Sequence, residues 1–288
     1  MSVASRRTVA RRRAGAITIT IRSSVGILVA LYILISSYPF VLMLSGSLKS
    51  RQEVIANPWP WPREFTLDTL RETWKTLNFG TYLLNSVVIA GGTCALALVL
   101  FPLAAYAFAV LRFPLRRTLF SVFIASIFVP GVTVLLPVVL LDFRLGLLGS
   151  PWAVILPLTN GAAPVAILLL KAAFDAIPRE LREAAILDGC SEWSIYWRIY
   201  LPLARSGLVT IAILNFVASW NEYVLPSVTN DDPSLYPLPV GLQNLVSTSV
   251  VQWNQVMAGS LLLVLPVILV FLALQRYFIN GLQGSIKG

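Results

Sequence analysis

The chain has 288 residues, of which 57% are hydrophobic and only 12% are charged. Soluble domains carry roughly 25% charged residues, so this composition excludes an ordinary soluble globular protein and indicates a chain built for a lipid environment. The formal net charge is +9 and histidine is absent, which removes the commonest metal ligand and the side chain that titrates most readily near neutral pH.

Six long apolar stretches follow one another along the chain. They lie at about residues 24–46, 82–110, 118–141, 151–170, 207–228 and 256–275. Each is close to the roughly 20 apolar residues that a membrane-crossing helix needs. We therefore expect an all-α, polytopic membrane protein with about six transmembrane helices. One membrane domain then covers residues 24–275, between a basic N-terminal segment (1–23) and a C-terminal tail (276–288).

The distribution of basic residues predicts the orientation of these spans. If the N-terminus is cytoplasmic, sixteen of the 22 Lys and Arg residues fall in cytoplasmic segments and six in outer segments. Cytoplasmic loops of membrane proteins carry such an excess, so we expect both termini in the cytoplasm of a bacterial or archaeal cell. The basic N-terminal run then lies near anionic lipid headgroups; it comprises Arg6, Arg7, Arg11, Arg12 and Arg13. The membrane accounts for the positive charge, and no nucleic-acid partner is expected.

The loop between the fourth and fifth spans, residues 171–206, is polar and helix-forming. Apolar residues recur at helical spacing in two sets, Ile177, Leu181, Ala184 and Ala185, and then Trp193, Tyr196, Trp197 and Tyr200. Between them Gly189 is expected to end the first helix in a left-handed conformation, and Ser191 to cap the second. The pattern predicts a helix, a glycine turn and a helix. An amphipathic hairpin on the inner leaflet is the alternative, but the loop has as many acidic as basic residues, which suits anionic lipid poorly.

This loop resembles the EAA loop of the membrane subunits of ATP-binding-cassette importers. The matching positions are Glu183, Ala184, Ala185, Gly189, Ile199, Leu201 and Pro202. The resemblance implies that the loop is a cytoplasmic coupling loop that docks on a separate ATPase, with Glu183 paired to a basic residue there. Cys190 departs mildly from the small or polar residue that the family usually has after the glycine.

Other segments resemble the maltose-type carbohydrate permeases of the same importers. They are the proline-rich stretch Pro58–Pro62, Phe65-Thr66-Leu67, Asn85-Ser86 and, in the tail, Asn280-Gly281-Leu282. Prolines should hold the first of these extended, and a short helix is expected where Leu70, Trp74 and Leu77 recur. The resemblance implies these partners: a second permease, two ATPase subunits, an extracytoplasmic sugar-binding protein and membrane lipid.

The sequence contains no Gly-x-x-x-x-Gly-Lys-Ser/Thr segment, the backbone cradle with which many ATPases hold phosphate. We therefore expect a transport subunit that is not an enzyme and binds no cofactor or metal. ATP and Mg²⁺ belong to the partner ATPase.

Polar side chains gather near the end of the fifth span, where they are costly unless they face a cavity or one another. They are Trp220, Asn221, Glu222 and Tyr223, and Asn160 adds a polar group in the fourth span. The Trp-Asn-Glu-Tyr segment resembles an element of carbohydrate permeases. Amide and carboxylate groups suit sugar hydroxyls and aromatic rings suit sugar C–H faces, so these five residues are candidates for the substrate pathway. Alternatively they brace neighbouring helices, or lie at the outer interface where water satisfies them.

These expectations describe one permease subunit of an ATP-driven, binding-protein-dependent importer of a mono-, di- or oligosaccharide. Two alternatives remain open. An importer permease for a non-sugar solute would carry the same loop. An ion-driven secondary transporter would show intramembrane acidic or histidine relays and internal repeats, for which the sequence offers only Glu222 and no convincing repeat.

Overall fold

A computed structural model describes residues 3–57, 59–247 and 250–286, and side chains at 25–57, 59–247, 250–273 and 275. Regular structure within these ranges is entirely helical, as the sequence predicts. The basic N-terminal run and the family-like tail segment lie outside the described side chains.

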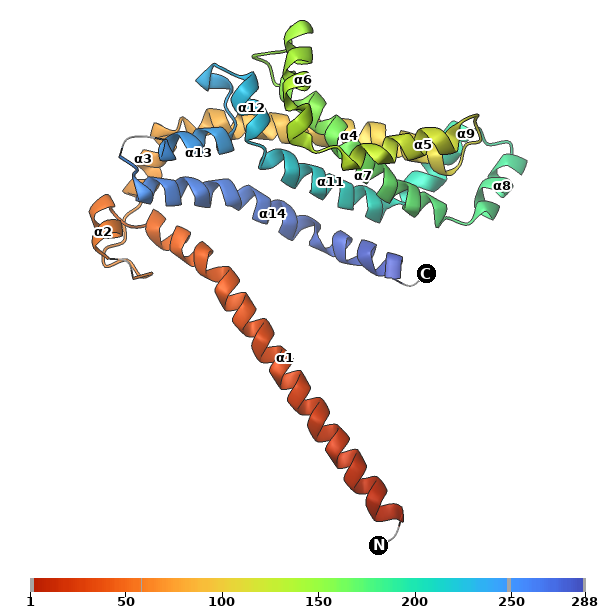
Figure 1. Cartoon of the computed structure of the whole chain (residues 1–288), viewed down its shortest axis with the longest axis horizontal. Helices are drawn as coiled ribbons and strands as arrows, with labels where there is room; N and C mark the ends of the chain where they lie inside the picture. Colours follow the sequence, from red (N-terminus) through yellow and green to blue (C-terminus); the bar gives the residue numbers. More distant parts are fainter. Residues whose placement is uncertain (1–2, 58, 248–249, 287–288) are drawn as a thin grey trace. The chain divides into compact units, whose positions relative to one another are not determined.

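Four described helices are long and apolar enough to cross a membrane, and they agree with four of the predicted spans (Figure 1). They are Val25–Ser47 within α1 (Val3–Ser47), α4 (Phe79–Ala109), α7 (Trp152–Asp175) and Trp253–Ala273 within α14 (Trp253–Ile286). Shorter helices connect them. These are α2 (Arg51–Ala56), α3 (Asp68–Thr76), α8 (Arg179–Leu187), α9 (Glu192–Ile195), η2 (Tyr196–Tyr200), α10 (Leu201–Leu203), α12 (Val224–Thr229), η3 (Pro233–Leu235) and α13 (Leu238–Val246).

The predicted span at 118–141 is not one helix. It consists of α5 (Arg116–Ala125) with the 3₁₀ turn η1 (Ser126–Phe128), followed by α6 (Gly131–Arg144) at an angle of 105°. The break falls at Val129, which is extended (φ −85°, ψ 114°) because the following Pro130 disfavours helical conformation in its predecessor.

The predicted span at 207–228 is also shorter than expected. Helix α11 (Arg205–Trp220) ends at the Asn-Glu-Tyr segment, and the chain from Glu192 to Leu203 meets it at 75°. If each bent pair is one span, the described residues form up to six spans, in agreement with the expected fold class.

The helices pack as two units, one of residues 1–71 with 253–261, the other of residues 72–252 with 262–288. In the first unit, the proline-rich segment folds around a buried cation. The Lys49 ammonium donates to the carbonyl oxygens of Asn57 (3.1 Å) and Trp59 (2.5 Å). The rings of Trp59 and Trp61 stay exposed, as expected for residues at a membrane–water interface.

In the second unit, α4 packs against α7 and α11 (Figure 1). Small side chains let the helix backbones approach closely, and a Cβ at Gly207 of α11 would stand 3.4 Å from the Cβ of Ala173 in α7. Ala97, Ala105 and Ala166 are likewise buried at these contacts. Because lipid offers no hydrophobic drive, such close van der Waals contact is what holds membrane helices together.

At one end of this unit, a loop is held against the beginning of α4. The Asn85 amide donates to the carbonyl oxygens of Ser234 (2.8 Å) and Tyr236 (3.1 Å). The neighbouring Ser86 hydroxyl accepts from the backbone N–H of Leu238 at 2.8 Å. The Asn-Ser pair thereby fixes η3 and the first turn of α13.

Candidate coupling site and transport pathway

The first half of the loop between α7 and α11 is an α-helix that a glycine terminates. Pro178 stands at the N-cap of α8, and Gly189 has φ +79° after its end. The Cys190 N–H donates to the Ala185 carbonyl (2.9 Å) and the Gly189 N–H to the Ile186 carbonyl (3.0 Å). This is the Schellman pattern, which satisfies the last carbonyls of the helix and needs a left-handed residue. The predicted glycine turn is therefore confirmed.

The second half begins as predicted and then departs from a regular α-helix. The Ser191 hydroxyl accepts from the Ser194 N–H at 3.3 Å. Residues Tyr196–Tyr200 form a π-helix, which the Leu201 N–H closes on the Tyr196 carbonyl. Pro202 cannot donate a backbone hydrogen bond, and in an α-helix its ring would clash with the carbonyl four residues earlier, so it disfavours α geometry in the preceding turn.

Because of the wider turn, only some of the predicted aromatic stripe is buried. Tyr196 and Tyr200 are buried, while the rings of Trp193 and Trp197 are more than half exposed. The expectation of a regular second helix is wrong, because of the π-turn. Trp193, Tyr196 and Trp197 still contact one another, with ring centroids 5.5–5.7 Å apart.

An ion pair joins the two halves of the loop, and a hydrogen bond joins it to α4. The Arg182 guanidinium contacts both carboxylate oxygens of Glu192, and the Tyr106 hydroxyl donates to Glu192 Oε2 at 2.6 Å. The hydrogen bond with Glu192 raises the pKa of Arg182 above its ordinary value. No sequence pattern predicts this triad, because Tyr106 lies 86 residues before Glu192 along the chain.

Aromatic packing fixes the loop further. The ring of Tyr106 meets Tyr196 and Tyr200 edge-on, with centroids 5.2 Å and 5.0 Å apart, and Phe174 of α7 stands edge-on to Tyr200 at 5.7 Å. Such pairs add about 0.5–1.5 kcal/mol each beyond their buried area. The loop is therefore packed directly against the ends of α4 and α7.

The residues of the predicted coupling motif divide between core and surface. Ala185 is buried, Ile199 and Leu201 are partly buried, and Glu183, Ala184, Gly189 and Pro202 are exposed. Of the wider predicted stripe, Ile177 is buried but Leu181 is not. Beside Glu183, the side chains of Ile186 and Leu187 are 44% and 88% exposed. Helix α8 thus presents an acidic group next to apolar side chains that this chain does not cover.

The predicted pathway residues are not equivalent. Trp220 is buried, stacks on Phe216 and donates from its indole nitrogen to the Leu263 carbonyl at 3.0 Å. Its ring is therefore held inside this chain. Asn160, Asn221 and Tyr223 are exposed.

Asn221 and Glu222 also shape the backbone at the end of α11. The Asn221 amide donates to the Val217 carbonyl at 2.7 Å. The Glu222 carboxylate accepts from the Leu225 N–H at 2.9 Å and so caps α12. No group of three or more potential metal ligands among His, Cys, Asp and Glu occurs among the described residues.

The architecture is that of a polytopic helical membrane protein with an exposed helical hairpin held against the ends of its spans. Comparison with known proteins gives the family. Residues 99–283 match the family described as "Binding-protein-dependent transport system inner membrane component", and the chain belongs to this family. It is a multi-pass permease of the inner or cell membrane, from an importer of the ATP-binding-cassette (ABC) type, with no ATPase domain and no cofactor of its own.

Individual relatives cover most of the chain. The inner membrane ABC transporter permease protein YcjP of Escherichia coli (strain K12) is 34% identical over 90% of this chain and 94% of its own length. The diacetylchitobiose uptake system permease protein NgcG of Streptomyces coelicolor is 30% identical over 90% of this chain and 87% of its own. A chain from a bacterial ABC transporter involved in the import of the acidic polysaccharide alginate shares the fold, with a TM-score of 0.80, 23% identity, and coverage of 92% of this chain and 98% of that one.

Proposed function

We propose that this chain is a permease subunit of a carbohydrate importer and that the α8–α9 loop transmits the force of a partner ATPase. The observation that carries the coupling role is the attachment of an exposed acidic and apolar helix, through Arg182, Glu192 and Tyr106, to the end of a membrane span. An ATPase that grips α8 would thereby move α4 and α7 as well.

The proposal fixes an orientation. The loop, both termini and the surface of α8 lie in the cytoplasm, and the loop held by Asn85 and Ser86 faces outward, where a binding protein would dock. A second permease and two ATPase subunits complete the importer. ATP would close the ATPases, and the spans would rock between inward- and outward-facing states.

Of the candidate pathway residues, Asn160, Asn221 and Tyr223 are exposed and Glu222 is partly exposed, so these four side chains can meet a sugar. An amide and a phenol can exchange hydrogen bonds with sugar hydroxyls, and the phenol ring can cover a C–H face. The name of NgcG, a diacetylchitobiose uptake system permease protein, supports a carbohydrate as the transported solute.

The coupling role is tested by Glu183→Ala, with the exposed Asp188→Asn as the matched control in the same loop. Removal of the Glu183 carboxylate should cost about 1.5–3 kcal/mol of docking free energy, the range of a hydrogen bond to a charged group. Recovery of the ATPase with the purified permease should fall for Glu183→Ala and not for Asp188→Asn. Full recovery together with normal uptake in Glu183→Ala would exclude coupling through this helix.

The substrate class is tested by uptake of labelled mono- and disaccharides, with a labelled amino acid and glycerol phosphate as non-sugar solutes. The proposal expects a sugar to stimulate ATP hydrolysis by the complete importer. Stimulation by a non-sugar solute alone would leave the permease role intact and assign it another substrate.

A further inference from the structure

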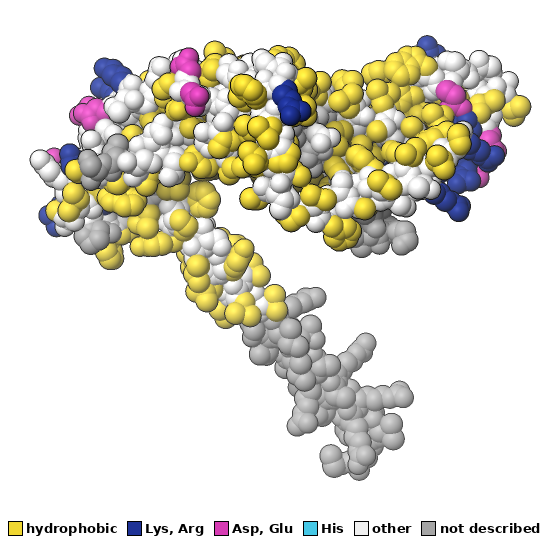
Figure 2. All heavy atoms as spheres, turned by 45° about the horizontal axis from the view of Figure 1, so that its top comes forward, with side chains coloured by type: hydrophobic (Ala, Val, Ile, Leu, Met, Phe, Trp, Pro, Cys, Tyr) yellow, Lys and Arg dark blue, Asp and Glu magenta, His cyan; other side chains and the backbone are white. Residues whose placement is uncertain are grey.

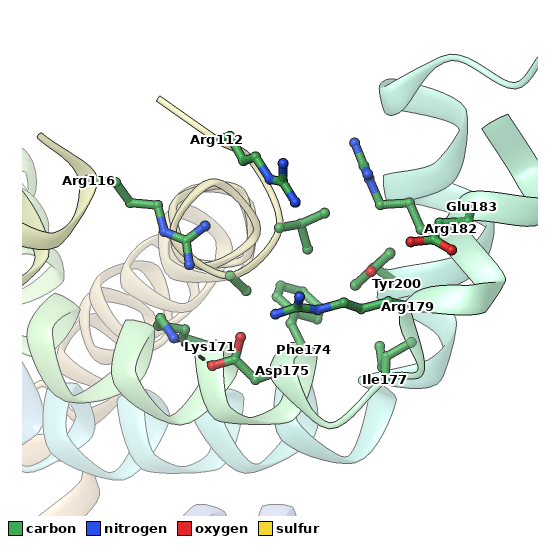
Figure 3. Close-up of a pocket in the computed structure, with 12 residues that line it drawn as sticks. Arg112, Arg116, Lys171, Phe174, Asp175, Ile177, Arg179, Arg182, Glu183 and Tyr200 are labelled. Atoms are coloured by element: carbon green, nitrogen blue, oxygen red, sulfur yellow. Dashed lines mark hydrogen bonds and ion pairs between the residues drawn. The ribbon is translucent and has the colours of Figure 1, made fainter. Parts of the chain in front are cut away.

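A basic cavity of about 420 Å³ lies beside the coupling loop, and the coupling role gives no function to three of the arginines that line it, Arg112, Arg116 and Arg179. Figure 3 shows Arg112, Arg116 and Arg179 directing their guanidinium groups toward the same space, over the ring of Phe174. They come from three segments: the turn after α4, the start of α5, and the start of α8.

The acidic side chains at the cavity do not neutralise these arginines. Asp175 is paired with Lys171 at 2.5 Å, and Glu183, the other acidic residue that lines the cavity, is exposed (Figure 3). Arg116 donates to the Leu111 carbonyl at 2.8 Å, which positions it but leaves its charge in place. None of the three arginines has a carboxylate partner within 4 Å among the described residues.

The cavity lies at the level where two membrane spans end. Helix α4 ends at Ala109 and α7 at Asp175, and both ends line it. Figure 2 shows Lys and Arg side chains gathered at this end of the unit. Next to the cavity, α5 and its N-cap residue expose apolar side chains, with Leu115 70%, Leu119 50% and Val122 67% exposed.

From this arrangement we propose that the cavity binds the phosphate group of an anionic phospholipid, whose acyl chains lie along α5. Three guanidinium groups can offer paired N–H donors to phosphate oxygens. Basic pockets between membrane helices at the headgroup level suit anionic lipid. The even charge balance of the loop sequence does not oppose this site, because folding adds Arg112 and Arg116 from another loop, so that five basic and two acidic side chains line the cavity.

Such a lipid would bridge α4, α5 and α8, and so hold the loop in place from the membrane side. The proposal is independent of the transported solute. It needs only the membrane placement of α4 and α7.

The test uses the assembled importer in nanodiscs of mixed phosphatidylcholine and phosphatidylglycerol, with retained lipid counted by native mass spectrometry. The variant R112Q/R116Q/R179Q should retain phosphatidylglycerol about tenfold more weakly than the wild type, because it loses three charge-assisted contacts. The control R63Q/R71Q/R144Q removes the same charge from exposed arginines outside the cavity and should retain the lipid normally. Equal retention in the variant and the wild type would overturn the proposal.

Two further arms identify the source of the phosphate group and exclude an ATPase contact. Inorganic phosphate is added to the importer in phosphatidylcholine nanodiscs; if it binds as tightly as the lipid does, the site takes free phosphate and the lipid assignment is wrong. If the variant retains lipid but loses the ATPase, the cavity is a protein contact and the proposal is again overturned. The single variant Arg179→Gln gives the same readout with a smaller, about threefold, loss if the triple variant does not assemble.

Discussion

Arg182 and Glu192 form an ion pair across the turn at Gly189, and the Glu192 carboxylate also accepts a hydrogen bond from Tyr106 in α4. Three segments that are separate in the sequence are thereby joined at one carboxylate. The loop is therefore attached to a membrane span, α4, and does not lie as a separate hairpin on the membrane surface.

Glu192→Gln should therefore loosen the loop from α4. Both ion-pair partners are partly exposed, so the ion pair contributes at most about 1 kcal/mol, and the hydrogen bond from Tyr106 to the charged oxygen adds about 1.5 kcal/mol. We expect a lower melting temperature of the assembled complex and less solute moved per ATP hydrolysed.

The double-mutant cycle of Tyr106→Phe and Glu192→Gln separates this effect from a general one. The two changes should be non-additive, because both act on the same hydrogen bond: Tyr106→Phe removes its donor, and Glu192→Gln removes the charge on its acceptor. Asp188→Asn, an exposed neighbour, is the charge control. Additive effects would mean that Glu192 and Tyr106 act independently.

Substitution of Gly189 tests the turn itself. A Cβ there would meet no atom within 4 Å, so only the backbone angle, φ +79°, opposes a side chain. Gly189→Val should be severe and Gly189→Ala should cost about 1–2 kcal/mol, whereas Gly189→Asn should be nearly tolerated because Asn adopts this conformation more readily.

Gly161 is the matched control, because a Cβ there also meets nothing within 4 Å but its backbone is helical. Gly161→Ala should leave ATPase recovery unchanged. If Gly189→Val and Gly161→Ala behaved alike in that assay, the left-handed turn would not matter for coupling.

The sequence was sufficient for the fold class and for the local signals of the loop. Hydrophobic length predicted the spans, and the conformational demands of Gly189 and Ser191 are local, so both were confirmed. The broken span at Pro130, the π-helix before Pro202 and the enclosed Trp220 were not predicted. The two helix irregularities come from proline, and the burial of Trp220 comes from tertiary packing. The spacing of apolar residues predicts neither, because it indicates only which residues can share a helix face.

The hydrogen bonds of Asn85 and Ser86 attach a second loop, the one that contains η3, to α4. Ser86→Ala should leave the Leu238 N–H without its acceptor, and Asn85→Ala should release two carbonyls. Each should destabilise the loop by about 1–3 kcal/mol. Amide hydrogen exchange of residues 233–246 should accelerate, while exchange in α8 stays unchanged. If residues 233–246 exchanged at the wild-type rate in both variants, the Asn-Ser pair would not hold the loop.

The candidate pathway residues should separate into two groups on mutation. Trp220→Phe removes the hydrogen bond to Leu263, so it should lower thermal stability while transport per assembled complex stays normal. Asn221→Ala should lower uptake per assembled complex, because a sugar hydroxyl would lose a partner at about 1–3 kcal/mol.

Glu222→Gln tests both roles of this residue. The amide oxygen can still accept from the Leu225 N–H, so the cap on α12 should survive while the charge is lost. Normal uptake per complex in Asn221→Ala and Glu222→Gln would remove both residues from the pathway and direct attention to the second permease.

The assignment of α8 to the coupling site is tested most simply by finding on which side of the membrane α8 lies and whether the ATPase covers it. The probe is a single cysteine in a background that lacks Cys94 and Cys190. Leu187→Cys lies at a position that is 88% exposed, and Asp232→Cys lies beside the loop that Asn85 holds. A membrane-impermeant maleimide should label position 187 only from the cytoplasmic side, and the assembled ATPase should protect it; position 232 should be labelled only from outside. Labelling of position 187 from outside, or at the same rate with and without the ATPase, would contradict the assignment of this loop as the coupling site.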